Sequence, residues 1–283
     1  MAGHLLDAGH ELEVFNRTPE RARELVDRGA HWCDSPAELA GRTEVVFTML
    51  GYPEDVRETV LGQGDLLEAM PSGSLLIDMT TSRPSLAVEI AAAAADRDVA
   101  TLDAPVSGGD IGARNATLVI MVGGTHEAFE RALPLLSVLG ATVKLHGEAG
   151  SGQHTKMMNQ VAIASGMIGV CEALLYAHRS GLDVEDALAT IKDGAAGSWS
   201  LSNYGPRLLR GDLEPGFKID HFLKDLGIAL SEARSMDLAL PGTALAEQLY
   251  LAARSQGLGV NGTQALAVAL ARLSGEEWPA HQD

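Results

Sequence analysis

The sequence predicts an α/β domain built on a largely parallel sheet, followed by an all-helical domain. In the first half, short apolar strands alternate with helical segments, which is the pattern of right-handed βαβ units. After about residue 150, every periodic segment has helical spacing. The 283 residues are 46% hydrophobic and 4% aromatic, so they can bury a sizeable core of small and aliphatic side chains. We expect one domain over residues 1–149 and a second over residues 150–283.

The charge and the cysteines exclude several classes of partner. The formal net charge is 21 − 38 = −17, which argues against nucleic acid or an anionic membrane surface as a partner. Cys33 and Cys171 form neither a disulfide framework nor a metal-ligand cluster, and this favours a reducing compartment. The sequence shows neither an apolar run of transmembrane length nor a leader peptide. We therefore predict a cytoplasmic protein with no metal, nucleic-acid or membrane partner.

The first half is expected to contain six strands, each with the apolar or alternating pattern of a buried sheet. They are His10–Asn16, Val45–Leu50, Ser74–Met79, Val99–Asp103, Thr117–Val122 and Thr142–Leu145. Helices are expected beside them over Met1–Gly9, Pro19–Gly29, Glu54–Leu61 and Pro84–Arg97. The first of these helices begins without a capping residue, as if cut in mid-course.

Six helices are expected in the second half. They are Gln153–Ser180, Asp183–Asp193, Asn203–Leu209, His221–Met236, Pro241–Gln256 and Gln264–Ser274. At the start of the first, Gln153, Lys156, Asn159 and Gln160 share one helical face, because residues three and four apart are neighbours. We expect this lysine and these amides to look out together at the domain junction, a favoured place for small-molecule sites. The alternative is an ordinary surface lysine near a helix start.

Asn16, Arg17 and Thr18 follow the first expected strand. In a dinucleotide-binding fold this position receives the adenosine ribose, and an arginine there accommodates a 2′-phosphate. The Arg17 guanidinium can fork onto such a phosphate. The alternative is a simple turn in which Thr18 caps the helix that Pro19 enters, and both interpretations can hold together.

Two further stretches follow buried strands. Thr80, Thr81 and Ser82 stand where strand ends face the ligand crevice of an open α/β sheet, although one of these hydroxyls could simply cap the next helix. Ser107-Gly108-Gly109 allows backbone N–H groups to approach a ligand closely, and a carboxylate is a natural guest. A tight turn is the alternative for Ser-Gly-Gly.

Eight motifs occur in order along nearly the whole chain. They read M-A-G-H-L-L-D-A-G-H, V-F-N-R-T, V-F-T-M-L, D-M-T-T-S-R-P, D-A-P-V-S-G-G, I-M-V-G-G, G-S-G-Q-H-T-K-M-M-N-Q and H-F-L-K-D-L. In this order they resemble the β-hydroxyacid dehydrogenases of the 3-hydroxyisobutyrate dehydrogenase type. The resemblance implies a Rossmann domain, a helical domain that forms much of a homodimer or homotetramer contact, and an active site between them. It also implies a small 3-hydroxy acid or semialdehyde as substrate, with NADP, or alternatively NAD, as cofactor.

The same resemblance implies roles for individual residues. Lys156 would be the catalytic acid/base, and Ser107, Gly108 and Gly109 would bind the substrate carboxylate. Asn159 would orient the substrate, with Gln160 as its rival, because the family often has asparagine four residues after the lysine. The cofactor would contact seven residues, which are Asn16, Arg17, Thr18, Met49, Leu50, Thr81 and Lys224.

The chain departs from the family pattern at its start. Members begin with a strand and a G-x-G-x-x-G loop that cradles the pyrophosphate, whereas this sequence begins at the methionine that follows the loop. We expect the missing strand and loop to be encoded in frame upstream of Met1. Without them, a non-catalytic binding or scaffold protein is an alternative. An imine reductase-like enzyme is another, but Lys156 argues against it because those enzymes usually carry Asp or Tyr there.

Overall fold

The computed structural model describes residues 1–62 and 66–278 and divides into two compact units. The first unit is Met1–Lys156 and the second is Met157–Asp283. The long helix α9 (Ser151–Arg179) runs through the division. The sequence places the division just before this helix, whereas the structure places it after the first turns of α9.

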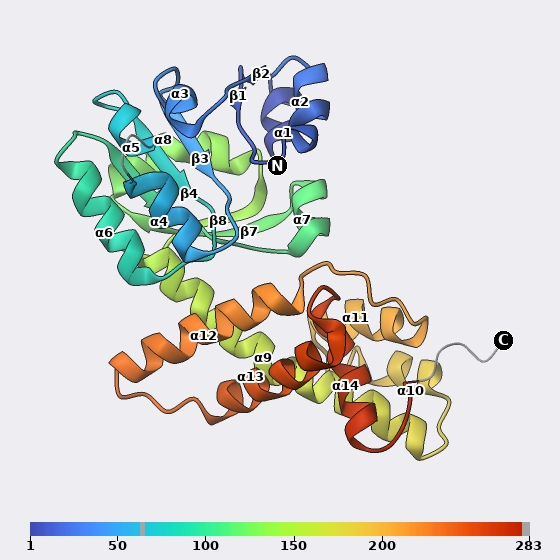
Figure 1. The fold of residues 1–283 in the computed structure, drawn as a ribbon. Helices are drawn as coiled ribbons and strands as arrows, with labels where there is room; N and C mark the ends of the chain where they lie inside the picture. Colours follow the sequence, from blue (N-terminus) through green and yellow to red (C-terminus); the bar gives the residue numbers. More distant parts are fainter. Residues whose placement is uncertain (63–65, 279–283) are drawn as a thin grey trace. The chain divides into compact units, whose positions relative to one another are not determined.

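The strands of the first unit form two sheets (Figure 1). A parallel pair contains β1 (Glu13–Val14) and β2 (His31–Trp32). The six-stranded sheet contains β3 (Val45–Thr48), β4 (Leu75–Asp78), β5 (Ala100–Asp103), β6 (Val106–Ser107), β7 (Leu118–Gly124) and β8 (Gly140–Leu145). In it β3, β4 and β5 are parallel neighbours, β7 runs antiparallel to β5 and β6, and β8 is parallel to β7.

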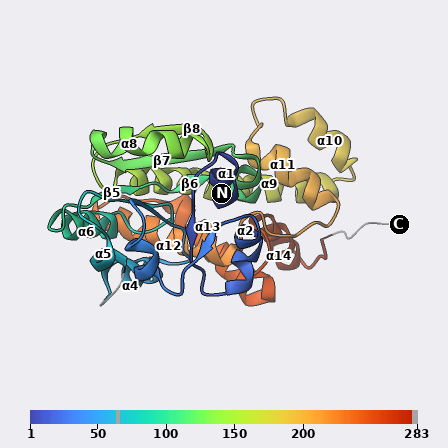
Figure 2. The ribbon, with the colours of Figure 1, turned by 90° about the horizontal axis from the view of Figure 1, so that it is seen from above.

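Eight helices, of which α6 and α8 are the longest, carry the rest of the described first unit up to the start of α9. They are α1 (Ala2–Asp7), α2 (Arg23–Asp27), α3 (Pro36–Ala40), α4 (Pro53–Leu61), α5 (Leu66–Ala69), α6 (Pro84–Ala95), α7 (Gly109–Asn115) and α8 (His126–Ser137). A 3₁₀ turn, Pro19–Ala22, leads into α2. Figure 2 shows α8 on one side of the strands and α4, α5 and α6 on the other.

Strand β4, which pairs with β3 and β5, is buried on both faces, and its successive side chains point to opposite sides. Leu75 and Ile77 of β4 join a core that includes α8, whereas Leu76 between them joins a core that includes α4 and α6. The predicted buried strand over Ser74–Met79 is therefore confirmed. Over Val45–Leu50, half-buried and buried residues alternate in β3. The parallel strands β3, β4 and β5 end in register, so Thr48, Asp78 and Asp103 lie side by side at the same end of the sheet.

The second unit is all helical, as the sequence predicts (Figure 1). With α9 it contains α10 (Val184–Ile191), α11 (Trp199–Leu209), α12 (Ile219–Ser235), α13 (Pro241–Ala253) and α14 (Leu266–Leu273). Helix α13 continues as a π turn (Arg254–Leu258), and a 3₁₀ turn (Thr263–Ala265) leads into α14. Buried side chains such as Met167, Phe222 and Tyr250 form one core between these helices.

The expectation about membrane-length apolar runs is wrong for α9. By length and composition alone this helix is long and apolar enough to cross a membrane. Its glycines, alanines and aliphatic residues are interrupted by few charges, which is also typical of the core helix of a soluble protein. Ala164, Met167, Cys171 and Leu174 of α9 do pack in the core of the second unit.

Several short elements escape the sequence analysis, which places no element at β2, α3, α5, β6, α7 or α8. Most of them span seven residues or fewer, too few for periodicity to reveal. The first strand is also shorter than expected, with only Glu13 and Val14 paired to β2. In the described part of the chain no ladder joins β1 to β3, and the strand and loop expected upstream of Met1 stay a prediction.

Candidate active site

The start of α9 is held by a buried carboxylate from β5. Asp103 is 4% exposed and accepts the Gly150 N–H at 2.7 Å and the Gln153 N–H at 2.8 Å. Gly150 has a φ of +91°, a backbone conformation that glycine adopts without strain. Two of the N–H groups that a helix start leaves without intrahelical partners are therefore satisfied by one side chain.

Gln153 and Lys156 lie inside the protein rather than facing solvent. The Gln153 side chain is fully buried, accepts the Ser82 N–H at 2.9 Å and donates to the Thr80 carbonyl at 2.7 Å. Lys156 follows one turn later and is 6% exposed. Because Lys156 is buried, the alternative of an ordinary surface lysine is wrong, whereas the expectation that this face looks toward the domain junction stays a prediction.

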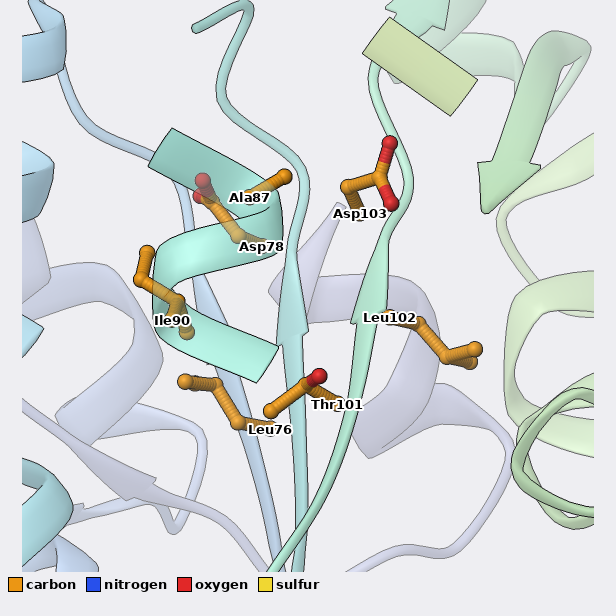
Figure 3. Close-up of a pocket in the computed structure, with 7 residues that line it drawn as sticks. All are labelled: Leu76, Asp78, Ala87, Ile90, Thr101, Leu102 and Asp103. Carbon is orange, nitrogen blue, oxygen red and sulfur yellow. The ribbon is translucent and has the colours of Figure 1, made fainter. Parts of the chain in front are cut away.

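The ends of β3 and β4 form a hydrogen-bonded network beside Asp103. Thr48 donates its hydroxyl to Asp78 at 2.8 Å, and the Thr80 N–H donates to the same Asp78 oxygen at 3.1 Å. The Thr80 hydroxyl in turn accepts the Leu50 N–H at 2.8 Å. Figure 3 shows Asp78 and Asp103 on neighbouring strands, lining a small pocket with Ala87 and Ile90 of α6.

Burial raises the pKa of the Asp103 carboxyl from 3.8 to about 6. The bonds from Gly150 and Gln153 lower the pKa, and the negative field of Asp78 raises it. Desolvation is the largest of these effects. The protein therefore holds an anion at the start of α9 under conditions that disfavour its charge.

In the D-M-T-T-S-R-P loop, the Thr80 and Ser82 hydroxyls do not cap α6. Arg83 occupies the N-cap position of α6 and makes no side-chain capping bond. Ser82 is buried, and its hydroxyl makes no hydrogen bond within the described residues. Capping is therefore not the role of the Ser82 hydroxyl. Thr81 is half-buried in this loop, and Met49, after β3, is 57% exposed.

Ser107-Gly108-Gly109 forms the passage from β6 into α7. Ser107 pairs with Val119 of β7 and ends the short strand β6. Gly108 has a φ of +127° and Gly109 a φ of +61°, so both adopt a conformation that glycine favours. The tight-turn alternative and a backbone site for a ligand are both compatible with this geometry.

The turn after β1 is exposed. Asn16 accepts the Thr18 N–H at 2.9 Å through its side-chain oxygen, which forms an Asx turn. Thr18 occupies the N-cap position before Pro19, but its hydroxyl makes no capping bond. The Arg17 side chain is 73% exposed and lies 3.2 Å from Asp55 of α4. The guanidinium is therefore accessible, with one acidic neighbour.

Within the second unit, four polar side chains of α9 and α12 form a chain. Asn159 donates to the Gln160 carbonyl oxygen at 2.8 Å, and Gln160 donates to Asp225 at 2.6 Å. The other Asp225 oxygen lies 3.0 Å from the Lys224 ammonium. Gln160 is 1% exposed, whereas Asn159 is only half-buried. Gln160 is therefore surrounded by other protein groups, and Asn159 is partly accessible.

The structure thus adds residues that the sequence analysis did not single out. Asp103 and Asp225 both appear within quoted motifs, but neither spacing nor composition distinguishes a buried acceptor from a solvated carboxylate. Asp55 stands in α4, far in sequence from Arg17. Among residues 1–62 and 66–278, no group of three or more His, Cys, Asp or Glu side chains is placed to hold a metal ion.

Known protein families match both units. Residues 1–147 match the family described as the NAD binding domain of 6-phosphogluconate dehydrogenase. Residues 150–270 match the family described as NAD-binding of NADP-dependent 3-hydroxyisobutyrate dehydrogenase. The two matches meet at the start of α9.

Individual relatives cover most of the chain. An uncharacterized oxidoreductase of Bacillus subtilis is 53% identical, with 94% of this chain and 92% of the relative aligned. The 3-hydroxyisobutyrate dehydrogenase of Pseudomonas aeruginosa is 37% identical over 88% of this chain and 86% of its own length. The 2-hydroxy-3-oxopropionate reductase of Escherichia coli is 36% identical over 91% and 88%.

Solved structures agree with these matches. The Mycobacterium tuberculosis 3-hydroxyisobutyrate dehydrogenase with L-serine superposes with a TM-score of 0.85 at 29% identity, covering 95% of this chain and 94% of that one. Psf3 in complex with NADP+ and 2-OPP superposes with a TM-score of 0.87 at 26% identity, covering 94% of each chain.

Proposed function

Because the chain belongs to the β-hydroxyacid dehydrogenase family and is a 3-hydroxyisobutyrate dehydrogenase-like oxidoreductase, we propose that Lys156 is its catalytic acid/base. The reaction is the interconversion of a small 3-hydroxy acid and its semialdehyde or oxo acid. The observation that supports this role is the 6% exposure of Lys156 on a helix start that hydrogen bonds fix to the strand ends. A fixed, enclosed amine can exchange a proton with a substrate rather than with water.

Lys156 moves one proton in each direction. In oxidation, its neutral amine takes the proton of the substrate hydroxyl while the hydroxyl-bearing carbon loses a hydride. In reduction, the protonated amine gives a proton to the carbonyl oxygen. Hydride chemistry is supplied by the nicotinamide when it is bound.

The backbone at Ser107, Gly108 and Gly109 is the proposed carboxylate site. Gly108 and Gly109 carry no side chain and adopt positive φ angles, a backbone conformation in which successive N–H groups can bind a carboxylate. Asn159 is the proposed orienting residue rather than Gln160, because Gln160 is buried and bonded to Asp225. A carboxylate site explains why the substrate would be an acid.

The residues present fit a nicotinamide dinucleotide with a 2′-phosphate. Arg17 offers an accessible guanidinium, and no acidic residue stands at 16–18 to prefer ribose hydroxyls. Met49 and Leu50 at the end of β3, with Thr81, would line the nicotinamide half, and Lys224 would bind from α12. We therefore propose NADP as the preferred cofactor, with NAD as the alternative.

A homodimer or homotetramer is proposed from the exposed face of α9. Small residues at positions 162, 165, 166 and 169 make an even surface on this face, and Met158 and Tyr176 flank them, both largely exposed. A Cβ added at Gly166 or Gly169 would meet nothing within 4 Å. Light scattering coupled to size-exclusion chromatography distinguishes this assembly from a monomer.

A panel assay tests the reaction. Purified protein is given 3-hydroxy acids and the matching semialdehydes with NADP(H) and, separately, NAD(H), and absorbance of the reduced nicotinamide is followed. Matched controls are a 2-hydroxy acid and an alcohol without the carboxylate. We expect turnover of at least one 3-hydroxy acid pair and none of the alcohol. No turnover with any 3-hydroxy acid or semialdehyde would overturn the proposal.

A further inference from the structure

Asp103 is a buried carboxylate that the proton-transfer steps above do not use. It lies at the end of β5 on the pocket shown in Figure 3, and both of its oxygens accept N–H groups from the start of α9. The N–H group of Gln153 bonded to it stands one helical turn before Lys156. Asp103 is thus the side chain of β5 that is bonded to the turn before Lys156.

The contact between β5, β7 and α9 leaves no room for adjustment. Gly123 of β7 pairs with Asp103, and a Cβ added at Gly123 would lie 2.5 Å from the Asp103 carboxylate and 2.6 Å from the Gly152 nitrogen. A Cβ added at Gly152 would lie 2.5 Å from the carbonyl oxygens of Asp103 and Met121. The backbones of β5, β7 and α9 therefore touch directly, and the bonds to Asp103 hold the start of α9 at this contact.

Burial makes the ionised form of the Asp103 carboxyl energetically unfavourable in these surroundings. The charged neighbour that faces it is Asp78 of β4, while β7 presents glycine backbone, α6 presents Ala87 and Ile90, and α9 presents N–H groups. Asparagine would be easier to bury, but it has one acceptor oxygen and an NH2 group that would face the second N–H donor. Only a carboxylate accepts both N–H groups of α9.

We infer that Asp103 is the positioning residue for Lys156, because it fixes the first turn of α9 by accepting the N–H groups of Gly150 and Gln153. We call these two hydrogen bonds the anchor. The inference rests on the proposed function, since it holds that the anchor serves to position the catalytic lysine. It also makes a claim about the helix start that holds whether or not the lysine transfers a proton.

The experiment compares Asp103→Asn with Asp183→Asn, a matched control. Asp183 caps α10 by accepting the Asp186 N–H, and it lies outside the proposed catalytic and binding residues. Three experiments are done on each protein. They are steady-state kinetics, which give kcat and KM, NADPH binding by fluorescence titration, and residue-resolved amide hydrogen exchange. Thermal unfolding at neutral pH is recorded on the same samples.

We expect Asp103→Asn to lower kcat at least about tenfold and to accelerate exchange of the Gly150 or Gln153 amide by a similar factor. NADPH binding should stay within about threefold, and Tm should not fall more than in Asp183→Asn, because removing a buried charge offsets the lost bond. If Asp103→Asn lowered kcat and also lowered Tm by more than Asp183→Asn does, Asp103 would be a structural residue and the inference would be overturned. Unchanged kcat in an active enzyme would also overturn it.

Hydrogen exchange separates this inference from the proposed function. If the wild-type protein turns over no 3-hydroxy acid but Asp103→Asn accelerates exchange at Gly150 or Gln153, the proposed function fails and the anchor stands. Should Asp103→Asn not fold, the wild-type protein still decides. Its Gly150 and Gln153 amides should be protected although they begin a helix, and rapid exchange there would contradict the anchor.

Discussion

The start of α9 and the turn after β1 are two parts of the first unit that are built in opposite ways. At the start of α9, Asp103, Gln153 and Lys156 are buried. Hydrogen bonds of 2.7–2.9 Å join Asp103 to the Gly150 and Gln153 N–H groups and the Gln153 side chain to Ser82 and Thr80. In the turn after β1, Arg17 is 73% exposed and its neighbour is one carboxylate at 3.2 Å. Proton transfer needs fixed geometry, whereas choosing between two cofactors needs only an accessible charge.

The largest effect is expected at Lys156. Lys156→Ala should lower kcat by roughly 10²–10⁴-fold, the usual contribution of a positioned acid/base group. NADPH affinity should remain within a few-fold of wild type, since the lysine is proposed to act on the substrate. Steady-state kinetics and a binding titration measure both, with Lys192→Ala on the second unit as the control. Unchanged kcat would remove the lysine from the mechanism.

Asp225→Ala is expected to destabilise the second unit by about 3 kcal/mol, because it leaves the buried Gln160 amide without this acceptor and removes the ion pair with Lys224. Asp225→Asn is the matched control, since its carbonyl oxygen can still accept from Gln160 and should limit the loss. Urea unfolding measures both variants. Equal stability of the alanine variant and the wild type would show that the chain from Asn159 to Lys224 contributes nothing.

The Asp103 carboxyl should make stability depend on pH. Its pKa is about 6 in the folded protein against an ordinary value of 3.8, so the folded state binds this proton more tightly than the unfolded state. Its contribution to the free energy of unfolding is therefore greatest below about pH 4 and is lost as the pH rises through about 6.

The size of that change is about 3 kcal/mol, from roughly two pKa units. We expect the stability of wild type relative to Asp103→Asn to fall by this amount between pH 4 and pH 7, measured by chemical denaturation. Asp183→Asn serves as the control and should show no such trend. A difference that is constant across this range would mean that the buried carboxyl does not titrate there.

The smallest effect is expected in the exposed turn. Arg17→Ala should raise the KM for NADP about tenfold, because one charge-assisted contact to a phosphate is lost, and should leave the KM for NAD within about twofold. Arg21→Ala, an exposed arginine on the next turn, is the control. Equal changes for both cofactors would mean that Arg17 only forms part of the turn.

The sequence predicts the fold well where patterns are long. The buried strands β3, β4 and β5 and the helices α9, α12 and α13 follow from apolar runs and helical periodicity. Short elements such as β2, α3 and β6 do not, since two to five residues carry no period. The antiparallel direction of β7 also depends on pairing with β5 across twenty residues of chain, which local pattern does not encode.

Candidate site residues show the same limit. Helical spacing and the family resemblance both point to Lys156. Neither predicts its burial, because burial depends on what the rest of the chain places over the helix start. Asp103 and Gln153 belong to segments about fifty residues apart, and only the folded sheet brings them together. The place of Arg17 after a strand marks it as a candidate, but the sequence does not predict its ion pair with Asp55.

The central claim is that Lys156 carries the proton in hydride transfer. The most direct measurement is the pH dependence of kcat for oxidation of an active 3-hydroxy acid, in wild type and in Lys156→Ala. We predict that wild-type kcat rises with pH through one ionisation to a plateau, and that this ionisation is absent from the residual rate of the variant. The same ionisation with the same midpoint in Lys156→Ala would contradict the account, because another group would then carry the proton.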